Sequence, residues 1–329
     1  MLIKLIRAHP ISAIVIGAII FFITGIYGGL FIFQKQKSSC QSQYSFLNID
    51  VVCGSPDIIS KKEYTETRAE IIKFIEAQKA TGTISNASVF FRDLKRGPNF
   101  GVNELADFAP ASLLKLPLAL VFLSSAENQP AVLTHKFQYN GQTTVEMQSF
   151  PPQKSAKPNQ SYTIEELLKL MLVYSDNASY EALEAFLRKT PERTLLRFQT
   201  YQELGIIDPK DRIEEAVSVR GYSSLFRILY NVSYLNSELS EKVLGWLAES
   251  EFDLGLHQGV PKEIVIANKF GERFLDNGVK QLHDCGIIYY PENPYILCVM
   301  TMGKDFQKLA ETIGEISKKV YEEVNSRRL

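Results

Sequence analysis

The sequence predicts an α+β protein in which an antiparallel five-stranded sheet, flanked by two terminal helices, is joined to an all-helical lobe. Strand-like apolar runs lie near both ends of the folded part of the chain, at 87–94, around Phe100, and at 264–267, 281–290 and 295–302. The residues between them, from 111 to about 250, mostly follow helical spacing. Strands from the two ends of such a domain are expected to complete a single sheet.

This order of elements predicts one domain of two lobes, with a cleft between them. The domain covers 63–329. Its sheet lobe comprises 63–110 and 260–329, and its helical lobe comprises 111–259.

Apolar spacing and capping residues predict the individual helices. The terminal helices are expected at 62–79 and 306–328, where apolar residues recur at helical intervals. Thr163 followed by Glu166 forms a capping box for a helix that ends at Tyr174. Two further helices are expected, one from 177 to 188 and one that begins at 190–192.

The N-terminal part differs from the rest, because 11–33 contains no charged residue. At about 1.5 Å per residue, a helix of this length spans a hydrocarbon core of about 30 Å. A cleaved signal peptide is the alternative, but the apolar stretch is long and no small-residue cleavage site follows it. We expect a cytoplasmic stretch at 1–10, a single-pass transmembrane anchor at 11–33 and a tether at 34–62. The domain would then be held at the cell membrane, outside the cytoplasm.

Charge and composition argue against several classes of function. The chain has 36 basic and 37 acidic residues, so no nucleic-acid-binding surface is expected. Its four histidines are scattered and form no ligand pattern with the cysteines, so neither a metal nor another cofactor is expected. Cys285 and Cys298 should lie on neighbouring strands, diagonal rather than opposed, and buried free thiols are the expected state.

Three short strings carry candidate chemistry. Ser112-Leu113-Leu114-Lys115 opens an apolar helix, Ser175-Asp176-Asn177 lies between two helices, and Lys269-Phe270-Gly271 is expected at a strand end. A serine and a lysine three residues apart share one helix face, which places a nucleophile beside a potential base. Ser-x-x-Lys and Lys-x-Gly each occur about once by chance in a chain of this size. The combination and its order therefore indicate a site more strongly than any single string.

Each string also has a purely structural explanation. Ser-Asp-Asn contains helix-capping residues, and Ser112 can simply begin a buried helix. In that case Lys115 is a lone charge in an apolar run, which is an expensive placement. As a base near neutral pH, a lysine needs its pKa lowered by about 3 units, roughly 4 kcal/mol. Burial and a second cation, Lys269, both act in that direction.

In its motifs and in its sheet–helices–sheet layout, the chain resembles the penicillin-recognising serine hydrolases over about 63–325. The resemblance is to their class A β-lactamase-like branch. It implies that Ser112 is the acylated nucleophile, Lys115 its proton acceptor, and Ser175 the relay of a proton to the leaving nitrogen. It also implies that Asn177 orients Lys115 and the substrate amide, and that Lys269 lines the cleft.

The resemblance further implies the positions that bind substrate. The backbone N–H groups of Ser112 and Glu272 would form the oxyanion hole, and Gly271, which precedes Glu272 on the same strand, would also bind substrate. Phe270 stands where the family has a threonine or serine hydroxyl that contacts the substrate carboxylate. His283 lies near the place of an arginine found in many relatives. It either replaces part of that carboxylate contact or is a structural histidine.

One departure concerns hydrolysis of the acyl-enzyme. Class A enzymes carry a Glu-x-x-Leu-Asn loop whose glutamate activates the deacylating water. Here Glu192, Glu241 and Glu251 start Glu-x-x-Leu strings that lack the asparagine. Glu214 and Glu215 are expected to be surface charges, and the alternative is that one of them substitutes for that glutamate.

The expected function is that of a membrane-anchored serine hydrolase that forms an acyl-enzyme with a β-lactam or a D-alanyl peptide. The alternatives are a D-alanyl carboxypeptidase-like penicillin-binding protein and a non-hydrolytic penicillin-binding sensor or interaction domain.

Overall fold

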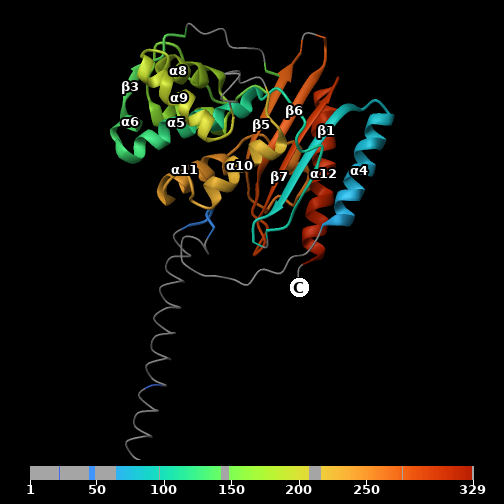
Figure 1. The fold of residues 1–329 in the computed structure, drawn as a ribbon. Coiled ribbons are helices and arrows are strands. Elements are labelled where there is room, and N and C mark those ends of the chain that lie inside the picture. The colour runs from blue at the N-terminus through green and yellow to red at the C-terminus, as the bar shows by residue number, and fades with distance from the viewer. Residues whose placement is uncertain are drawn as a thin grey trace, which may run out of the picture.

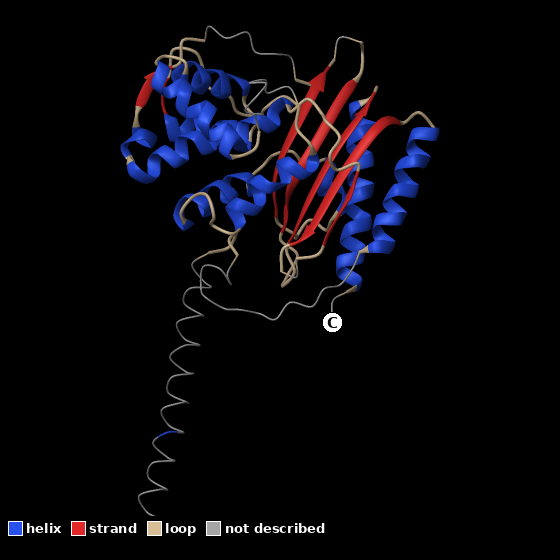
Figure 2. Ribbon diagram, viewed as in Figure 1, coloured by secondary structure: helices blue, strands red, loops and turns tan. Residues whose placement is uncertain are grey.

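The protein has the two-lobed layout that the sequence predicts (Figures 1 and 2). A computed structural model describes residues 22, 44–48, 64–95, 97–141, 148–206, 216–275 and 277–327. Five antiparallel strands form one sheet in the order β2-β1-β7-β6-β5. Their bounds are Ile84–Asp93 for β1, Asn99–Val102 for β2, Ile266–Phe274 for β5, Lys280–Ile288 for β6 and Tyr295–Gly303 for β7.

Two helices, α4 (Thr65–Ala80) and α12 (Phe306–Ser326), cover the face of the sheet that lies away from the helical lobe (Figure 1). Ile71 and Ile75 of α4 are fully or almost fully buried, as is Ile313 of α12. These apolar side chains recur at helical spacing, so each helix presents one stripe to the sheet.

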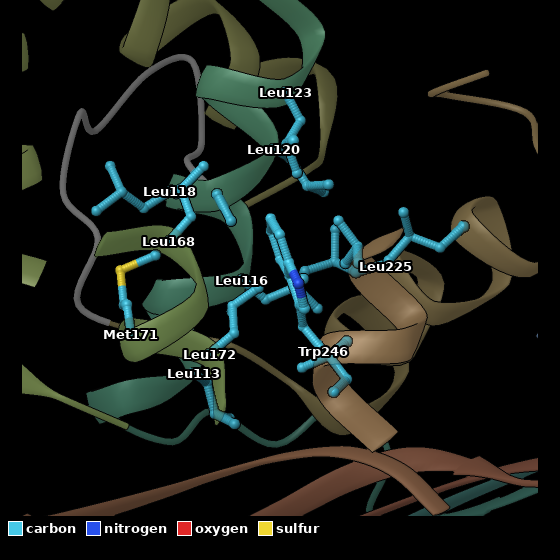
Figure 3. Packing of buried hydrophobic residues seen from close by; sticks show 14 of the residues in the cluster. Leu113, Leu116, Leu118, Leu120, Leu123, Leu168, Met171, Leu172, Leu225 and Trp246 are labelled. Carbon is cyan, nitrogen blue, oxygen red and sulfur yellow. The ribbon is translucent and has the colours of Figure 1, made fainter. Parts of the chain in front are cut away.

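The helical lobe is built around α5 (Lys115–Asn128). Residues 116–123 of this helix are apolar and buried on all sides, as expected for a helix surrounded by other helices. Figure 3 shows Leu116 and Leu120 of α5 packed with Trp246. The other helices of this lobe are η1 (Ala111–Leu114), α6 (Ala131–Thr134), α7 (Ile164–Val173), α8 (Asn177–Leu187), α9 (Pro191–Glu203), α10 (Val219–Tyr230) and α11 (Ser237–Ala248). The short helix η2 (Gly255–Gly259) follows α11 and packs against α12, where Ser317 donates to the Leu256 carbonyl at 2.8 Å. The predicted capping box, Thr163 with Glu166, starts α7.

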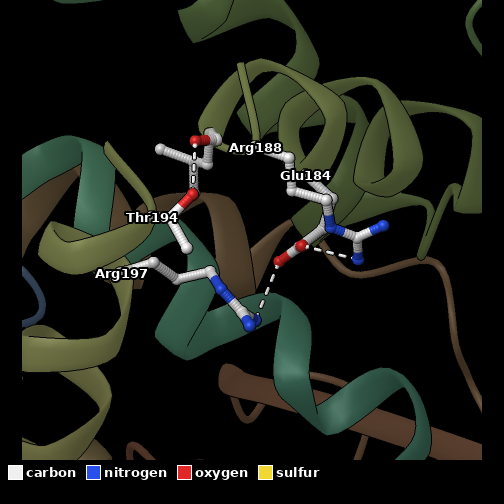
Figure 4. A network of polar contacts seen from close by, with 5 residues as sticks. Glu184, Arg188, Thr194 and Arg197 are labelled. Atoms are coloured by element: carbon white, nitrogen blue, oxygen red, sulfur yellow. Dashed lines mark hydrogen bonds and ion pairs between the residues drawn. The ribbon is translucent and has the colours of Figure 1, made fainter. Parts of the chain in front are cut away.

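A buried carboxylate links α8 to α9 (Figure 4). The Glu184 side chain is only 1% exposed, and it pairs with Arg188 at 3.0 Å and with Arg197 at 3.2 Å. A buried charge requires such partners, because desolvation otherwise costs several kcal/mol.

The structure departs from the sequence-based predictions in one strand of the large sheet and in one small two-stranded sheet. β5 continues through Lys269-Phe270-Gly271, so this string lies inside the strand and not at its end. A two-stranded sheet of β3 (Lys136–Gln138) and β4 (Ser161–Thr163) was not predicted. Both strands are three residues long, too short to show an alternating pattern.

The prediction of free thiols at Cys285 and Cys298 is wrong, because the two residues form a disulfide. The β6–β7 hairpin pairs Ile288 with Tyr295, so three residues back and three residues forward bring Cys285 directly opposite Cys298. Residues in such a pair have their Cβ atoms close enough to be bridged. The error lay in the register of the hairpin.

The predicted cytoplasmic stretch 1–10 and the anchor 11–33 lie outside the described residues, apart from Phe22. Within the described part of the chain, no helix combines the length and the apolar character that a membrane span needs.

Part of the predicted tether 34–62 is described, and it packs against the domain. Leu47 is 3% exposed. The backbone N–H of Ser45 donates to Glu241 at 2.8 Å, and Tyr289 donates to the Phe46 carbonyl at 2.9 Å. Asn48 N–H donates to the Tyr230 carbonyl at 2.7 Å. Residues 44–48 are therefore a docked segment, and the remainder of the tether lies outside the described residues.

Candidate active site

Ser112 lies where the sheet lobe passes into the helical lobe. It belongs to the single 3-10 turn η1, whose first residue, Ala111, has a φ of 49°. The next element, α5, begins at Lys115, so serine and lysine lie one turn apart. Lys115 Nζ lies 3.0 Å from Ser112 Oγ. A residue of α10 also fixes the turn, because the buried Tyr222 hydroxyl donates to the Leu113 carbonyl at 2.9 Å.

A glycine allows β5 to approach this turn. A Cβ at Gly271 would lie 3.2 Å from Leu113 N, from Leu113 Cγ and from the Pro110 carbonyl oxygen. That is closer than ordinary van der Waals contact between carbon atoms. The glycine therefore lets the strand that carries Lys269 pass directly beside the turn that carries Ser112.

The Lys115 side chain is 2% exposed and lies among oxygen atoms from two elements. Besides Ser112, its Nζ contacts the Ser175 carbonyl at 2.5 Å, Ser175 Oγ at 3.2 Å and Asn177 Oδ1 at 2.6 Å. These contacts join the first predicted string to the second. They also supply the partners that a buried lysine needs.

The Ser175-Asp176-Asn177 string forms the junction between α7 and α8. Ser175 has a φ of 53°, a left-handed conformation that turns the chain sharply and points its hydroxyl at the two lysines. Asp176 is the N-cap of α8 and accepts hydrogen bonds from Ala178 N at 3.2 Å and Ser179 N at 2.9 Å. The aspartate therefore fixes the turn, while its two neighbours face the site.

Lys269 reaches the same hydroxyl from the sheet. Its Nζ donates to Ser175 Oγ at 2.9 Å and to the Phe270 carbonyl at 3.0 Å, and the residue is 1% exposed. Burial holds the pKa of Lys269 well below its usual range, and the Lys115 charge lowers it further, whereas Asp284 and Glu272 oppose both effects. The structure thus brings together all five predicted catalytic residues: Ser112, Lys115, Ser175, Asn177 and Lys269.

Phe270 faces the aromatic packing under the sheet. Its ring stacks on Phe252 at 4.0 Å between centroids and makes an edge contact with Phe150 at 6.2 Å. It is 5% exposed. This position therefore contributes apolar packing where a hydroxyl was expected from the resemblance.

The Glu272 side chain has a role that the sequence did not reveal. Its carboxylate accepts hydrogen bonds from Ser149 N at 2.9 Å and Phe150 N at 3.1 Å. Gln148, next to them, donates to the Ser175 carbonyl at 3.4 Å. The residue whose backbone N–H is predicted to line the oxyanion hole therefore uses its side-chain carboxylate to hold the 148–150 segment next to the site.

His283 is fully buried below the segment that leads to Ser112. Its Nε2 lies 3.0 Å from the Ala109 carbonyl, which can only accept, so this nitrogen carries the hydrogen. Burial lowers the pKa of His283 to about 4, against the effect of its backbone hydrogen bonds. This geometry fits the structural alternative, and a contact of His283 with substrate stays a prediction.

Two polar residues behind Lys269 were also missed. Asn268 Nδ2 donates to Asp284 Oδ1 at 2.8 Å, and Leu256 N donates to Asp284 Oδ2 at 3.0 Å. Burial raises the pKa of Asp284 to about 6, although both hydrogen bonds oppose the shift. The sequence held no clear signal for this pair, because both strands also contain other polar and charged residues.

No described glutamate forms a hydrogen bond with Ser112, whose one described partner is Lys115. Glu192 is exposed in the first turn of α9, and Glu241 holds residues 45 and 46. Glu251 follows α11, and its Oε2 is buried without a described hydrogen-bond partner. Glu214 and Glu215 lie outside the described residues. Among the residues described, no group of three acidic, histidine or cysteine side chains forms a metal site.

The two-lobed fold and the serine–lysine–serine–lysine arrangement are those of a penicillin-recognising serine hydrolase. Residues 67–324 match the family model described as the β-lactamase enzyme family. The chain therefore belongs to the β-lactamase enzyme family. No curated protein matches the sequence.

Solved structures agree with this fold. A PBP-A mutant in an acyl-enzyme complex with penicillin G has 20% identity and a TM-score of 0.66, covering 82% of this chain and 100% of its own. The TLA-3 extended-spectrum β-lactamase has 17% identity and a TM-score of 0.65, covering 78% of this chain and 98% of its own. A class A β-lactamase from Mycobacterium abscessus has 20% identity and a TM-score of 0.64, covering 79% of this chain and 99% of its own.

Proposed function

We propose that the protein is a membrane-anchored serine hydrolase of the β-lactamase type, which forms an acyl-enzyme at Ser112 with a β-lactam or a D-alanyl peptide amide. The observation that carries the proposal is the 3.0 Å separation of Ser112 Oγ and Lys115 Nζ. It places a base within reach of the proton on the nucleophile.

The reacting form of Lys115 in this proposal is the neutral amine, because only that form can accept the Ser112 proton. The Ser175 carbonyl and Asn177 Oδ1 both accept hydrogen bonds, at 2.5 and 2.6 Å, and together they occupy the two N–H groups of a neutral amine. The lone pair is then left for the Ser112 hydroxyl. As Ser112 Oγ bonds to the substrate carbonyl carbon, its proton passes to Lys115 Nζ and the carbonyl oxygen becomes an oxyanion.

The second half of acylation needs a proton at the leaving nitrogen. Ser175 Oγ lies 3.2 Å from Lys115 Nζ and 2.9 Å from Lys269 Nζ. Ser175 therefore receives the proton from Lys115 and gives its own to the amide nitrogen as the C–N bond breaks. Two backbone N–H donors, from Ser112 and Glu272, would each stabilise the oxyanion by about 3 kcal/mol.

A second candidate function is a penicillin-binding protein that keeps its acyl group, as a carboxypeptidase-like enzyme with slow turnover or as a sensor. It is favoured by the surroundings of Ser112 Oγ, whose one described hydrogen-bond partner is Lys115 and not a carboxylate. The similar PBP-A structure is described as an acyl-enzyme complex with penicillin G, which supports acylation in this fold.

Labelling with a fluorescent penicillin tests the proposal and separates the two candidates. The full chain, purified in non-ionic detergent, is followed over time together with Ser112→Ala and Ser124→Ala. Ser124 lies on the same helix but outside the site, where it donates to the Val121 carbonyl, so it is the matched control. Label that appears and decays identifies a hydrolase, and lasting label identifies a sensor or slow enzyme. An unlabelled wild type, or a labelled Ser112→Ala, refutes acylation at Ser112.

A further inference from the structure

Three arginines line a cavity of about 200 Å³ between α10 and the strands β1 and β7. The polar residues of the lining are Arg92, Arg220, Ser223, Ser224 and Arg227. In the sheet, β7 and β6 separate β1 from β5, which carries Lys269. The cavity is therefore distinct from the Ser112 site.

The arginines converge because of the spacing on α10 and the register of the sheet. Arg220, Ser223, Ser224 and Arg227 follow one another at helical intervals, so they lie on one face of α10. Arg92 is in the last part of β1, directly opposite Ile296 of β7, and Ile296 also lines the cavity. One arginine thus comes from the sheet and two come from the helix above it.

The described residues leave this charge largely uncompensated. Arg220 lies 3.7 Å from a Glu104 carboxylate oxygen, with its side chain 57% exposed. No described carboxylate forms an ion pair with Arg92 or with Arg227. Burial lowers the pKa of Arg92, and the charges of Arg227 and Arg220 lower it further. Like charges held together repel one another, so an anion in the cavity would relieve this repulsion.

We propose that this cavity binds a phosphate-type oxyanion, either free phosphate or the phosphate of a lipid headgroup. Guanidinium groups bind phosphate through paired N–H donors, and three such groups offer more donors than the two oxygens of a carboxylate can accept. The volume is well above the roughly 15 Å³ that a single water requires, so there is room for a tetrahedral anion. The serine hydroxyls on the same helix face supply further polar lining.

The position of the cavity makes a lipid headgroup a concrete source. Tyr230 lies about one turn beyond Arg227 on α10, and its backbone carbonyl accepts a hydrogen bond from Asn48 N–H. Asn48 ends the docked segment 44–48, which follows the predicted anchor in the chain. The cavity therefore lies close to where the chain enters the domain.

Isothermal titration calorimetry on the full chain in non-ionic detergent tests this inference. The two probes are inorganic phosphate and glycerophosphoglycerol, the headgroup of phosphatidylglycerol without its acyl chains. Binding of at least one probe is expected, and it should weaken at high salt because the contacts are between charges. Tighter binding of glycerophosphoglycerol identifies the lipid headgroup as the source, and tighter binding of inorganic phosphate identifies the free ion.

Arg92→Gln and Arg227→Gln should each weaken binding about tenfold or more, as expected for loss of a charge-assisted hydrogen bond. Arg68→Gln is the matched control, because Arg68 is an exposed arginine on α4, outside the cavity lining. Arg227 is exposed, so its replacement tests the site even if Arg92→Gln does not fold. Penicillin labelling should be the same in all three variants. The proposal is overturned if neither probe binds at 10 mM, or if Arg227→Gln binds as tightly as the wild type.

Discussion

Lys269 Nζ lies 2.9 Å from Ser175 Oγ, although the two residues are 94 positions apart in the sequence. This contact closes the site, because it joins the sheet lobe to the junction between α7 and α8. It also places a second buried cation close to the serine that would deliver the leaving-group proton. The effect of Lys269 on the acylation rate and its effect on the unfolding free energy can be measured separately.

Replacing Lys269 with Met should slow acylation about 100-fold, since it removes a preorganised charge that contacts Ser175. The unfolding free energy at pH 7 should stay the same or rise. Because the pKa of Lys269 is lowered in the folded state, its charged form costs stability below the unfolded pKa of about 10.4. Any gain in stability should shrink as the pH approaches that value. Labelling rates and urea unfolding check both effects, and a parallel loss of activity and stability would contradict this role.

Gly271→Ala should separate β5 from η1. The new Cβ would lie 3.2 Å from both Leu113 N and the Pro110 carbonyl, and overpacking of this kind costs about 1–3 kcal/mol. We expect a Tm lower by several degrees and an acylation rate reduced about tenfold or more, since small displacements of reacting groups are costly. Gly245→Ala is the control, because its Cβ meets only Phe46 at an ordinary 3.7 Å. An unchanged labelling rate in Gly271→Ala would show that the close approach is not needed.

Glu272→Gln should improve the binding of anionic substrates. The carboxylate belongs to the residue whose backbone N–H is predicted to line the oxyanion hole, so it repels a substrate carboxylate. Removing a half-exposed charge should lower KM for benzylpenicillin about two- to fivefold, while kcat changes less. A methyl ester of the same penicillin lacks the charge and is the matched control. An equal change in KM for acid and ester would point to movement of the 148–150 segment, which Glu272 holds.

His283 should make stability depend on pH between about 6.5 and 4. Its folded pKa is lowered to about 4, so the unfolded chain binds a proton first as the pH falls. The stabilisation is therefore complete above pH 6.5, and about 3 kcal/mol of it is lost by pH 4. His283→Gln keeps a donor for the Ala109 carbonyl but does not titrate. Urea unfolding at pH 4 to 7 should show a smaller slope for this variant than for the wild type, and identical slopes would contradict the prediction.

The sequence was most informative where apolar periodicity and capping residues decide the local structure. The sheet, its flanking helices and the capping box at Thr163 follow from such patterns. The convergence of Ser112, Lys115 and Ser175 was predictable because their order along the chain resembles a known family. The geometry of each contact still required the fold.

The missed features depend on register and on side-chain reach, which the spacing of residues does not fix. The Cys285–Cys298 disulfide required the exact pairing of the β6–β7 hairpin. The Glu272 carboxylate binds backbone groups of Ser149 and Phe150, more than 120 positions away in the sequence. Hydrogen bonds of this kind leave no local pattern in the chain.

The docked segment 44–48 has a consequence for where the enzyme can act. If 11–33 is embedded in a bilayer, only ten residues, 34–43, separate its end from Tyr44, and a fully extended chain over these eleven steps reaches roughly 40 Å. Glu241 and Tyr289 hold this segment through hydrogen bonds. The domain could move farther from the bilayer only if residues 44–48 detached and those hydrogen bonds broke. Ser112 would then stay near the lipid surface, and the proposed substrates would have to diffuse to it.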